Sequence, residues 1–163
     1  MVKGLKEIIV GVIIFVLGAV IYAGISTPAP ILYLNQPYFP NERCYPNQMD
    51  FSNGHTYKFE LSNRAETEAV SKVCLYGDNL TFEIGDIKQN TSICYNEDTV
   101  PPKSSGLIKI YNPKIYVNGA DNFTLKTTVS CKSKVFRIPR PCDSLVISCN
   151  FKERWGNRYQ LIS

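Results

Sequence analysis

Hydrophobic and polar residues divide this chain of 163 residues into two unequal parts. Eighteen residues, from Ile8 to Ile25, contain no charged side chain and are mostly apolar. Because a helix rises about 1.5 Å per residue, this stretch covers about 27 Å, close to the roughly 30 Å hydrocarbon core of a bilayer. We therefore expect a transmembrane helix at residues 8–25, surrounded by the lipid bilayer. A buried helix of a soluble domain is the competing interpretation, but only the Tyr22 hydroxyl would give it a polar side.

The charges on either side of this stretch predict its orientation. Residues 1–7 contain Lys3 and Lys6, whereas residues 26–40 contain no charged side chain. By the positive-inside rule, residues 1–7 stay in the cytoplasm and the C-terminal part of the chain is extracytoplasmic. A cleaved secretory signal is the alternative, but the apolar run exceeds the usual length of about 7 to 15 residues and lacks an Ala-x-Ala site. An uncleaved signal anchor is therefore preferred.

Small residues recur within the apolar stretch. Gly11 and Gly18 are seven positions apart, and Ala19 and Ala23 are four apart. Such spacings let a second helix approach closely, so these positions are candidates for packing against a membrane partner or for self-association. A single lipid-facing helix is the alternative, because glycine and alanine are common in membrane helices.

The rest of the chain shows the two-residue period of strands that have one buried face. Tyr57, Phe59 and Leu61 alternate with Lys58 and Glu60. Further strands are expected at 70–76, 80–84, 92–95, 107–111, 114–117, 123–131, 135–138, 145–151 and 159–162. Turn signals separate them at 52–54, 77–79, 101–102, 118–119 and 156–157. Only residues 66–72 could form a helical turn, so the pattern predicts a mainly β fold, a β-sandwich, at residues 49–163.

Residues 26–48, which precede these strands, contain five prolines. Proline lacks the backbone N–H group that a central strand needs. We therefore expect a stalk here, with an edge strand at 31–34.

The six cysteines all follow the apolar stretch, on the side expected to be oxidising. They are Cys44, Cys74, Cys94, Cys131, Cys142 and Cys149. An even number of cysteines in such a compartment predicts three disulfides, and free buried thiols are the alternative. Six cysteines allow fifteen pairings, so the connectivity stays open. One bridge among the last three would clamp the final hairpins.

Composition and motifs offer no support for catalysis or nucleic-acid binding. The net charge is only +4, and the basic residues are interspersed with acidic ones. No two cysteines stand two to four residues apart, and the single histidine, His55, cannot complete a metal site. We expect His55 to be a solvated turn residue. The prediction is therefore that the protein is not an enzyme and has no catalytic residue, metal, cofactor or evident small-molecule substrate. An exported enzyme of unknown class is the alternative.

Two further sets of residues are candidates for modification and contact. Asn79, Asn90 and Asn122 begin acceptor sequences for N-glycosylation. Near the C-terminus, Trp155 stands with Arg154 and Arg158, and these residue types are frequent at protein interfaces. The preferred interpretation is that Trp155 caps one end of the sandwich with an arginine stacked on it. An interface formed by the three side chains is the alternative.

Residues 57–95 carry a resemblance to a known family. The sequence YKFELSN is followed by a polar stretch ending in Ala69 and then by VSKVCLYGDNLTFEIGDIKQNTSICY. This order of strands and turns resembles the CARDB-like immunoglobulin-fold modules of archaeal and bacterial surface proteins. The resemblance implies an immunoglobulin-like ectodomain that makes structural or protein–protein contacts at the cell envelope, for example as an accessory subunit of a membrane assembly.

The N-terminus carries a second resemblance. Lys3, Gly4 and Leu5, followed by Glu7 and the apolar stretch, look like the start of archaeal type IV pilins, which are cut after a Lys-Gly pair. The acidic residue here is the third after that site, whereas the family has it at the fifth position. The resemblance implies a filament subunit that is cleaved after Gly4 and assembles with copies of itself through the apolar helix.

Overall fold

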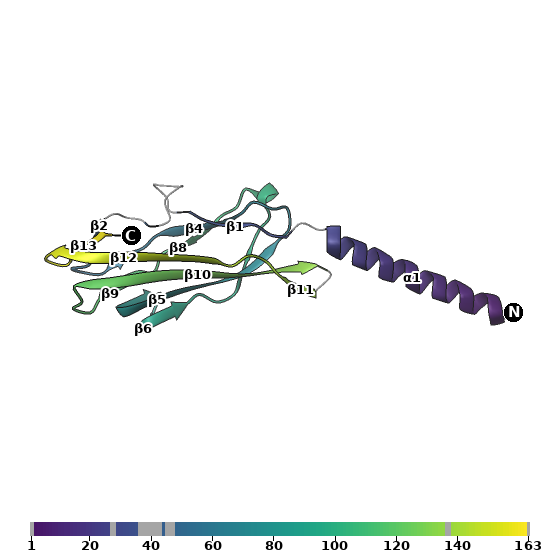
Figure 1. Ribbon diagram of the computed structural model, residues 1–163, viewed down its shortest axis with the longest axis horizontal. Coiled ribbons are helices and arrows are strands. Elements are labelled where there is room, and N and C mark those ends of the chain that lie inside the picture. The colour runs from purple at the N-terminus through teal and green to yellow at the C-terminus, as the bar shows by residue number, and fades with distance from the viewer. Residues whose placement is uncertain (1, 27–28, 36–43, 45–47, 136–137, 163) are drawn as a thin grey trace.

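The structure, a computed structural model, describes residues 2–26, 29–35, 44, 48–135 and 138–162. One α-helix, α1 (Val2–Ser26), lies at one end of the molecule, and antiparallel strands form most of the rest (Figure 1). The strands are β1 (Leu32–Asn35), β2 (Gln48–Asp50), β3 (His55–Thr56), β4 (Phe59–Asn63), β5 (Ala69–Ile84), β6 (Ile87–Cys94), β7 (Asp98–Val100), β8 (Lys109–Tyr111), β9 (Lys114–Val117), β10 (Asn122–Val135), β11 (Ile138–Pro141), β12 (Leu145–Trp155) and β13 (Arg158–Leu161). The mainly β fold expected from the sequence is confirmed.

The described strands form two sheets that share one hydrophobic core. The smaller sheet has the order β1-β4-β8. The larger sheet has the order β2-β13-β12-β10-β5-β9-β3, with β6 and β7 paired to β5 and β11 paired to β10. Leu61 of the smaller sheet and Leu75 of the larger sheet belong to the same buried cluster. This layered arrangement is consistent with the expected β-sandwich.

The alternation that predicts the strand around Phe59 is confirmed side chain by side chain. Tyr57, Phe59 and Leu61 are buried, whereas Lys58 is exposed and Glu60 is partly exposed. Burial of every second residue is the physical reason why a strand can be recognised from its sequence.

The largest difference from the sequence prediction lies in β5. A turn is predicted at 77–79, but Ala69–Ile84 is one strand of 16 residues. A Cβ atom on Gly77 would lie 2.7 Å from the Thr124 carbonyl oxygen, so the glycine lets β10 pass close by. Asn79 has a φ of 58°, and the register with β6 shifts at this point. The predicted turn is therefore a bulge within a continuous strand.

One other local prediction is wrong. The helical turn expected at 66–72 does not form, because β7 and β10 pair with β5 on both sides from Ala69 onward. A short 3-10 helix, η1, instead occupies Lys103–Ser105. Here the pairing of distant strands overrides the local pattern. Of the strand expected at 135–138, Val135 ends β10 and Ile138 begins β11, and residues 136–137 lie outside the described residues.

Part of the proline-rich segment 26–48 belongs to the domain. The edge strand expected at 31–34 is confirmed as β1, which pairs with β4 at the edge of the smaller sheet. Pro30 and Leu32 are buried, and Cys44 is bonded to a strand of the larger sheet. Within the described residues, the expected stalk is therefore tied to the domain at both of these places.

The six cysteines form three disulfides. The pairs are Cys44–Cys149, Cys74–Cys94 and Cys131–Cys142, with Cα–Cα distances of 5.6, 4.1 and 5.2 Å. The third pair closes the β10–β11 hairpin, as expected for one bridge among the last three cysteines. The prediction of disulfides is confirmed, and the tertiary pairing of strands supplies the connectivity that the sequence leaves open.

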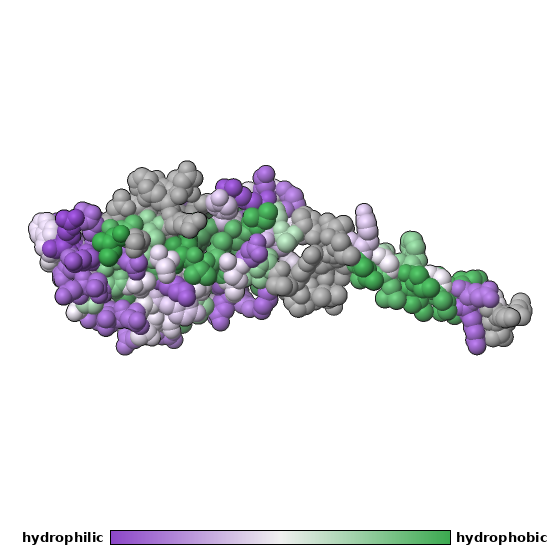
Figure 2. Space-filling view, in the orientation of Figure 1, coloured by the Kyte–Doolittle hydropathy of each residue, from purple (hydrophilic) through white to green (hydrophobic). Residues whose placement is uncertain are grey.

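The helix α1 extends away from the sheets. All side chains from Ile8 to Tyr22 are exposed, and Figure 2 shows hydrophobic residues over most of the face of the helix that it displays. Within the described ranges, no helix is both long and apolar enough to cross a membrane.

Candidate functional site

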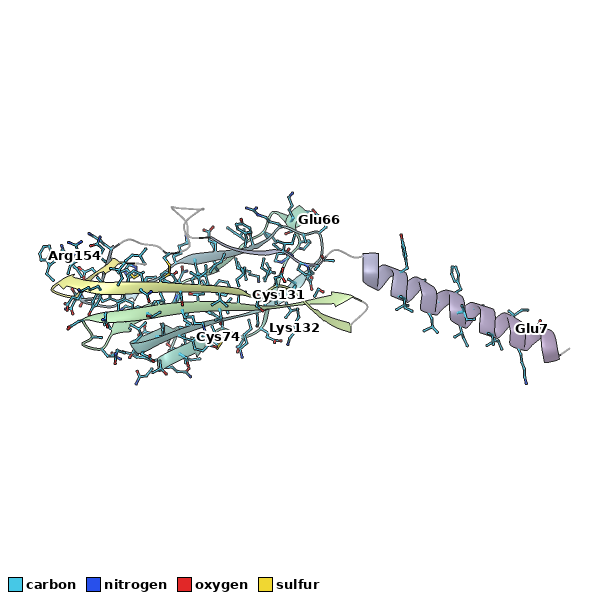
Figure 3. The ribbon with its side chains drawn as sticks, in the orientation of Figure 1. Glu7, Glu66, Cys74, Cys131, Lys132 and Arg154 are labelled. Carbon is cyan, nitrogen blue, oxygen red and sulfur yellow. A yellow bond between two sulfur atoms is a disulfide. The ribbon has the colours of Figure 1, made fainter. Side chains whose placement is uncertain are left out.

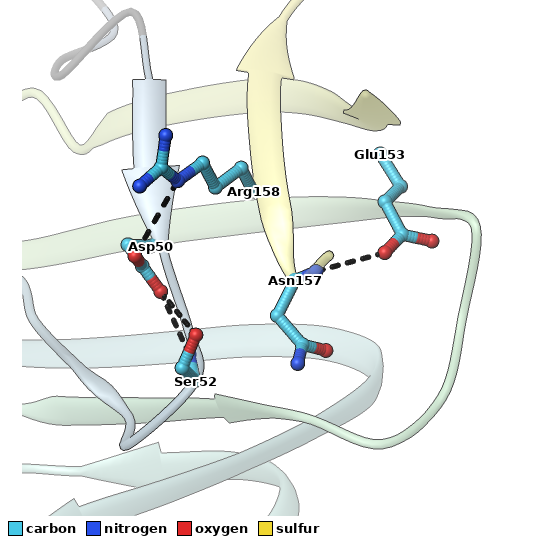
Figure 4. Close-up of polar contacts among 5 residues, drawn as sticks. All are labelled: Asp50, Ser52, Glu153, Asn157 and Arg158. Atoms are coloured by element: carbon cyan, nitrogen blue, oxygen red, sulfur yellow. Dashed lines mark hydrogen bonds and ion pairs between the residues drawn. The ribbon is translucent and has the colours of Figure 1, made fainter. Parts of the chain in front are cut away.

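The end of the domain opposite α1 is formed by the hairpin of β12 and β13 (Figure 1). Trp155 pairs with Arg158 across a two-residue turn, and both turn residues, Gly156 and Asn157, have positive φ angles of 57° and 64°. Glycine and asparagine adopt such angles at little cost, and this geometry joins twisted strands tightly. The Asn157 N–H donates a hydrogen bond of 2.9 Å to Glu153 Oε1 (Figure 4). The turn therefore holds Trp155 and Arg158 side by side at the tip.

The three interface candidates from the sequence lie together at this end. With three neighbours they line a hollow of about 210 Å³, which we call the distal tip site. Its residues are Gln48, Arg154, Trp155, Arg158, Tyr159 and Gln160. Figure 3 shows Arg154 at the opposite end of the molecule from Glu7 of α1.

Trp155 does not pack into the domain as the expected cap. Its side chain is 69% exposed, and the guanidinium carbon of Arg158 lies 5.0 Å from its ring centre. The expected stacking of an arginine on the ring is therefore present, but the ring itself faces solvent. An exposed indole beside cationic groups is a chemical surface that suits contact with a partner.

Asp50 partly neutralises one of the two arginines. Arg158 Nε lies 3.7 Å from Asp50 Oδ2, and the Ser52 N–H and hydroxyl donate hydrogen bonds of 2.9 and 2.6 Å to Asp50 Oδ1 (Figure 4). The hydrogen bonds from Ser52, followed by the charge of Arg158, lower the pKa of Asp50 below its ordinary value. Arg154 is exposed and, among the described residues, is not one of the side chains found in an ion pair. The distal tip site thus presents one exposed guanidinium besides the one that is paired with Asp50.

Sequence reasoning missed the two glutamines of this site. Gln48 lies on β2, which pairs with β13 so that Gln48 stands opposite Gln160 and Asp50 stands opposite Arg158. The period of two in β13 could have placed Gln160 on the same face as Arg158. No local signal could have found Gln48, because it reaches the site from more than one hundred positions away through strand pairing.

His55 differs from its sequence-based prediction as a solvated turn residue. It begins β3, is partly buried, and has its ring centre 5.5 Å from that of Phe51. Burial lowers the pKa of His55, against the opposing influence of Asp50. Its position is accounted for by packing against Phe51.

The three acceptor asparagines lie at the surface of the domain. Asn79 and Asn122 line one hollow of about 440 Å³ together with Tyr76 and Lys126. Asn90 lies on β6, and its side-chain oxygen accepts a hydrogen bond of 2.7 Å from Thr81. All three are exposed. Their glycosylation stays a prediction.

The remaining candidates concern α1 and metal binding. Apart from its chain neighbours and the backbone of its own helix, a Cβ atom on Gly11 or Gly18 would meet no atom within 4 Å, and Ala19 is exposed. The side chain of Ala23 lies outside the described part of the structure. The role of these small residues in helix packing stays a prediction. Among the residues that the structure describes, no group of three or more His, Cys, Asp or Glu side chains could hold a metal ion.

The chain was compared with protein families, with curated proteins and with solved structures. No protein-family model, curated protein or solved structure matches this chain.

Proposed function

We propose that this protein is a single-pass membrane protein whose extracytoplasmic, immunoglobulin-like domain makes protein contacts at the cell envelope through the distal tip site. The observation that carries the proposal is the exposed Trp155 beside the exposed Arg154, at the end of the domain opposite an apolar helix. An accessory subunit of a membrane assembly would have this arrangement, with its anchor at one end and its contact surface at the other.

The described part of α1 does not reach the length and hydropathy of a membrane-crossing helix, so support for the membrane anchor comes from the sequence of residues 8–25 and of its flanks. Residues 8–25 contain no charged side chain, and about 27 Å of helix approaches the roughly 30 Å of a hydrocarbon core. Lys3 and Lys6 favour a cytoplasmic N-terminus. Three disulfides in the domain favour the oxidising side of the membrane for the rest of the chain.

Support for an immunoglobulin-like module of the CARDB kind comes from the region 57–95. Strand β4 ends at Asn63, whose buried side chain accepts a hydrogen bond of 3.0 Å from the Ala65 N–H and donates one of 2.7 Å to the Thr67 carbonyl. Strands β5 and β6 then form a hairpin whose turn is Gly85-Asp86. The asparagine thus shapes the loop that follows the strand.

The chemistry of the distal tip site suggests the kind of group that it contacts. Arg154 and Arg158 can bind a carboxylate through paired N–H groups, and the indole ring of Trp155 offers an apolar surface beside them. We therefore expect the partner protein to present an acidic side chain next to an apolar one.

We expect photo-crosslinking in native membranes to find this contact. A benzoylphenylalanine placed at Trp155 should crosslink to a membrane or envelope protein. The additional change Arg154→Glu should reduce the amount of crosslinked product by at least about tenfold. The reason is that central Arg and Trp contacts of an interface often carry about 2 kcal/mol or more. Lys72→Glu makes the same change in charge on an exposed part of β5 and should leave the product unchanged. Equal loss in both variants, or no crosslink from the tip, would argue against a contact at this site.

A filament subunit related to type IV pilins is the second candidate. The observation in its favour is that α1 has exposed apolar side chains on all sides and glycines open to a neighbouring helix, which suits packing in a filament core as well as in lipid.

The intact mass of the natural protein separates the two candidates. A membrane anchor predicts that residues 1–4 are retained, whereas a filament subunit predicts a mass lower by these four residues. Retention of Gly4 together with Leu5 in the mature protein would remove the filament candidate.

A further inference from the structure

The junction between α1 and the domain is short. The Ile31 N–H donates a hydrogen bond of 3.3 Å to the Asn63 side-chain oxygen, and the Ile31 carbonyl accepts one of 2.8 Å from the Arg64 N–H. The chain is therefore attached to the domain from Ile31 onward. Between Ser26 at the end of α1 and Ile31, even a fully extended chain covers at most about 18 Å. Whatever surrounds α1 must lie close to this end of the domain.

This end of the domain has an exposed apolar surface. Strand pairing brings the start of β1, the end of β4 and the start of β8 together, since Leu32 stands opposite Asn63 and Leu61 stands opposite Lys109. Four large apolar side chains on these segments face solvent, and we call them the proximal patch. They are Ile31, Tyr33, Leu107 and Ile108, which are 56%, 39%, 64% and 47% exposed. Tyr33 lies on β1, whereas Ile31, Leu107 and Ile108 come directly before β1 and β8, so the patch lies at the ends of these strands. Leu32 and Leu61 next to it fill the core.

Polar groups around the patch suit the headgroup region of a bilayer. The guanidinium carbon of Arg64 lies 3.6 Å from the ring centre of Tyr33. Lys103 is exposed in η1, and Glu66 is the acidic neighbour, accepting a hydrogen bond of 3.2 Å from the Ser104 N–H. Glu68 is also exposed, and at the start of β8 the Lys109 ammonium is paired with Asp98 at 2.8 Å, so the polar groups around the patch carry both signs. Tyrosine rings are frequent where hydrocarbon meets headgroups, and the headgroup region accommodates charged groups of both signs. The patch therefore combines apolar area with an aromatic ring and a polar border, which suits this depth.

We propose that the proximal patch lies in the headgroup region of the same bilayer that holds α1, so that the domain is docked on the membrane and presents the distal tip site away from it. This inference rests on the proposed membrane anchor. Lipid is the occupant because the short junction keeps the patch within reach of whatever surface surrounds the C-terminal end of α1.

Single-tryptophan reporters test the docking in the full chain. The background variant is Trp155→Phe, to which Leu107→Trp adds a reporter in the patch, Tyr22→Trp one in the helix, and Ile87→Trp a matched control that is 58% exposed on the β5–β6 hairpin. Each protein is reconstituted in vesicles of phosphatidylcholine and phosphatidylglycerol, with and without brominated acyl chains. Bromine quenches only those indoles that lie in or against the lipid.

The outcomes separate the docking from the anchor. We expect quenching of the Y22W and L107W reporters, and unchanged fluorescence for I87W and for the natural Trp155. Quenching of Y22W with L107W as bright as I87W would keep the anchor and overturn the docking. A blue-shifted but unquenched L107W would show that protein, not lipid, covers the patch, which also overturns it. An unquenched Y22W would overturn the anchor, and the docking with it.

Discussion

Replacing Cys44 and Cys149 together by serine is expected to lower the free energy of unfolding of the domain by about 5 kcal/mol. This bridge joins residues 105 positions apart, so its loss frees a far longer loop in the unfolded chain than the loss of either other bridge. It also ties the segment between β1 and β2 to β12. Urea unfolding of the oxidised proteins measures the change.

The Cys131–Cys142 bridge provides the matched control. Its cysteines are only 11 positions apart, and the double change to serine at both should cost about 3 kcal/mol by the same relation. Each variant keeps two bridges and loses two sulfur atoms, so the difference between them isolates the length of the loop. An equal cost for the two variants, or a larger cost for the short loop, would contradict the role of loop closure in this domain.

Phe59→Ala is expected to cost about 3 to 5 kcal/mol, as for other fully buried phenylalanines. The Phe59 side chain is 0% exposed, its ring is stacked on Tyr111 at 5.1 Å, and Tyr57 lies 5.7 Å away. Tyr111 in turn makes an edge contact with Tyr95 at 4.7 Å, which links the smaller sheet to the end of β6. Removing the Phe59 ring would leave a cavity in this aromatic cluster, which the rigid strands cannot close.

The same substitution on α1 is the control for this prediction. Phe15 is 76% exposed, so Phe15→Ala should change the unfolding of the domain by less than about 0.5 kcal/mol. Unfolding of the domain can be followed by near-ultraviolet circular dichroism, to which the tyrosines contribute. A small effect of Phe59→Ala, similar to that of Phe15→Ala, would mean that the two sheets are not held together at this cluster.

Local patterns in the sequence were sufficient for much of the architecture. The alternation at 57–61 identified a strand with one buried face, and the glycine and asparagine at 156–157 identified the turn that forms the tip. The absence of charge at residues 8–25 separated α1 from the strands. These features depend on neighbouring residues only, through side-chain period, backbone φ preference and charge.

Local sequence patterns identified only part of the distal tip site. Arg154, Trp155 and Arg158 are close in sequence and were recognised together, but whether the indole is a cap or a contact surface depends on what packs against it. Gln48 reaches the same hollow through the pairing of β2 with β13. Residues that meet only through strand pairing leave no spacing signal in the chain.

The sequence by itself determined that this protein has one long apolar helix followed by a mainly β domain with an even number of cysteines, because composition and periodicity are properties of short segments. Only the tertiary structure decided which cysteines are bonded, that 69–84 is one strand and not two, and which side chains share each end of the domain. Gly77 shows the reason. Its neighbours in sequence suggest a turn, but a Cβ atom there would meet the Leu80 side chain and, at 2.7 Å, the backbone carbonyl oxygen of Thr124, which lies far along the chain.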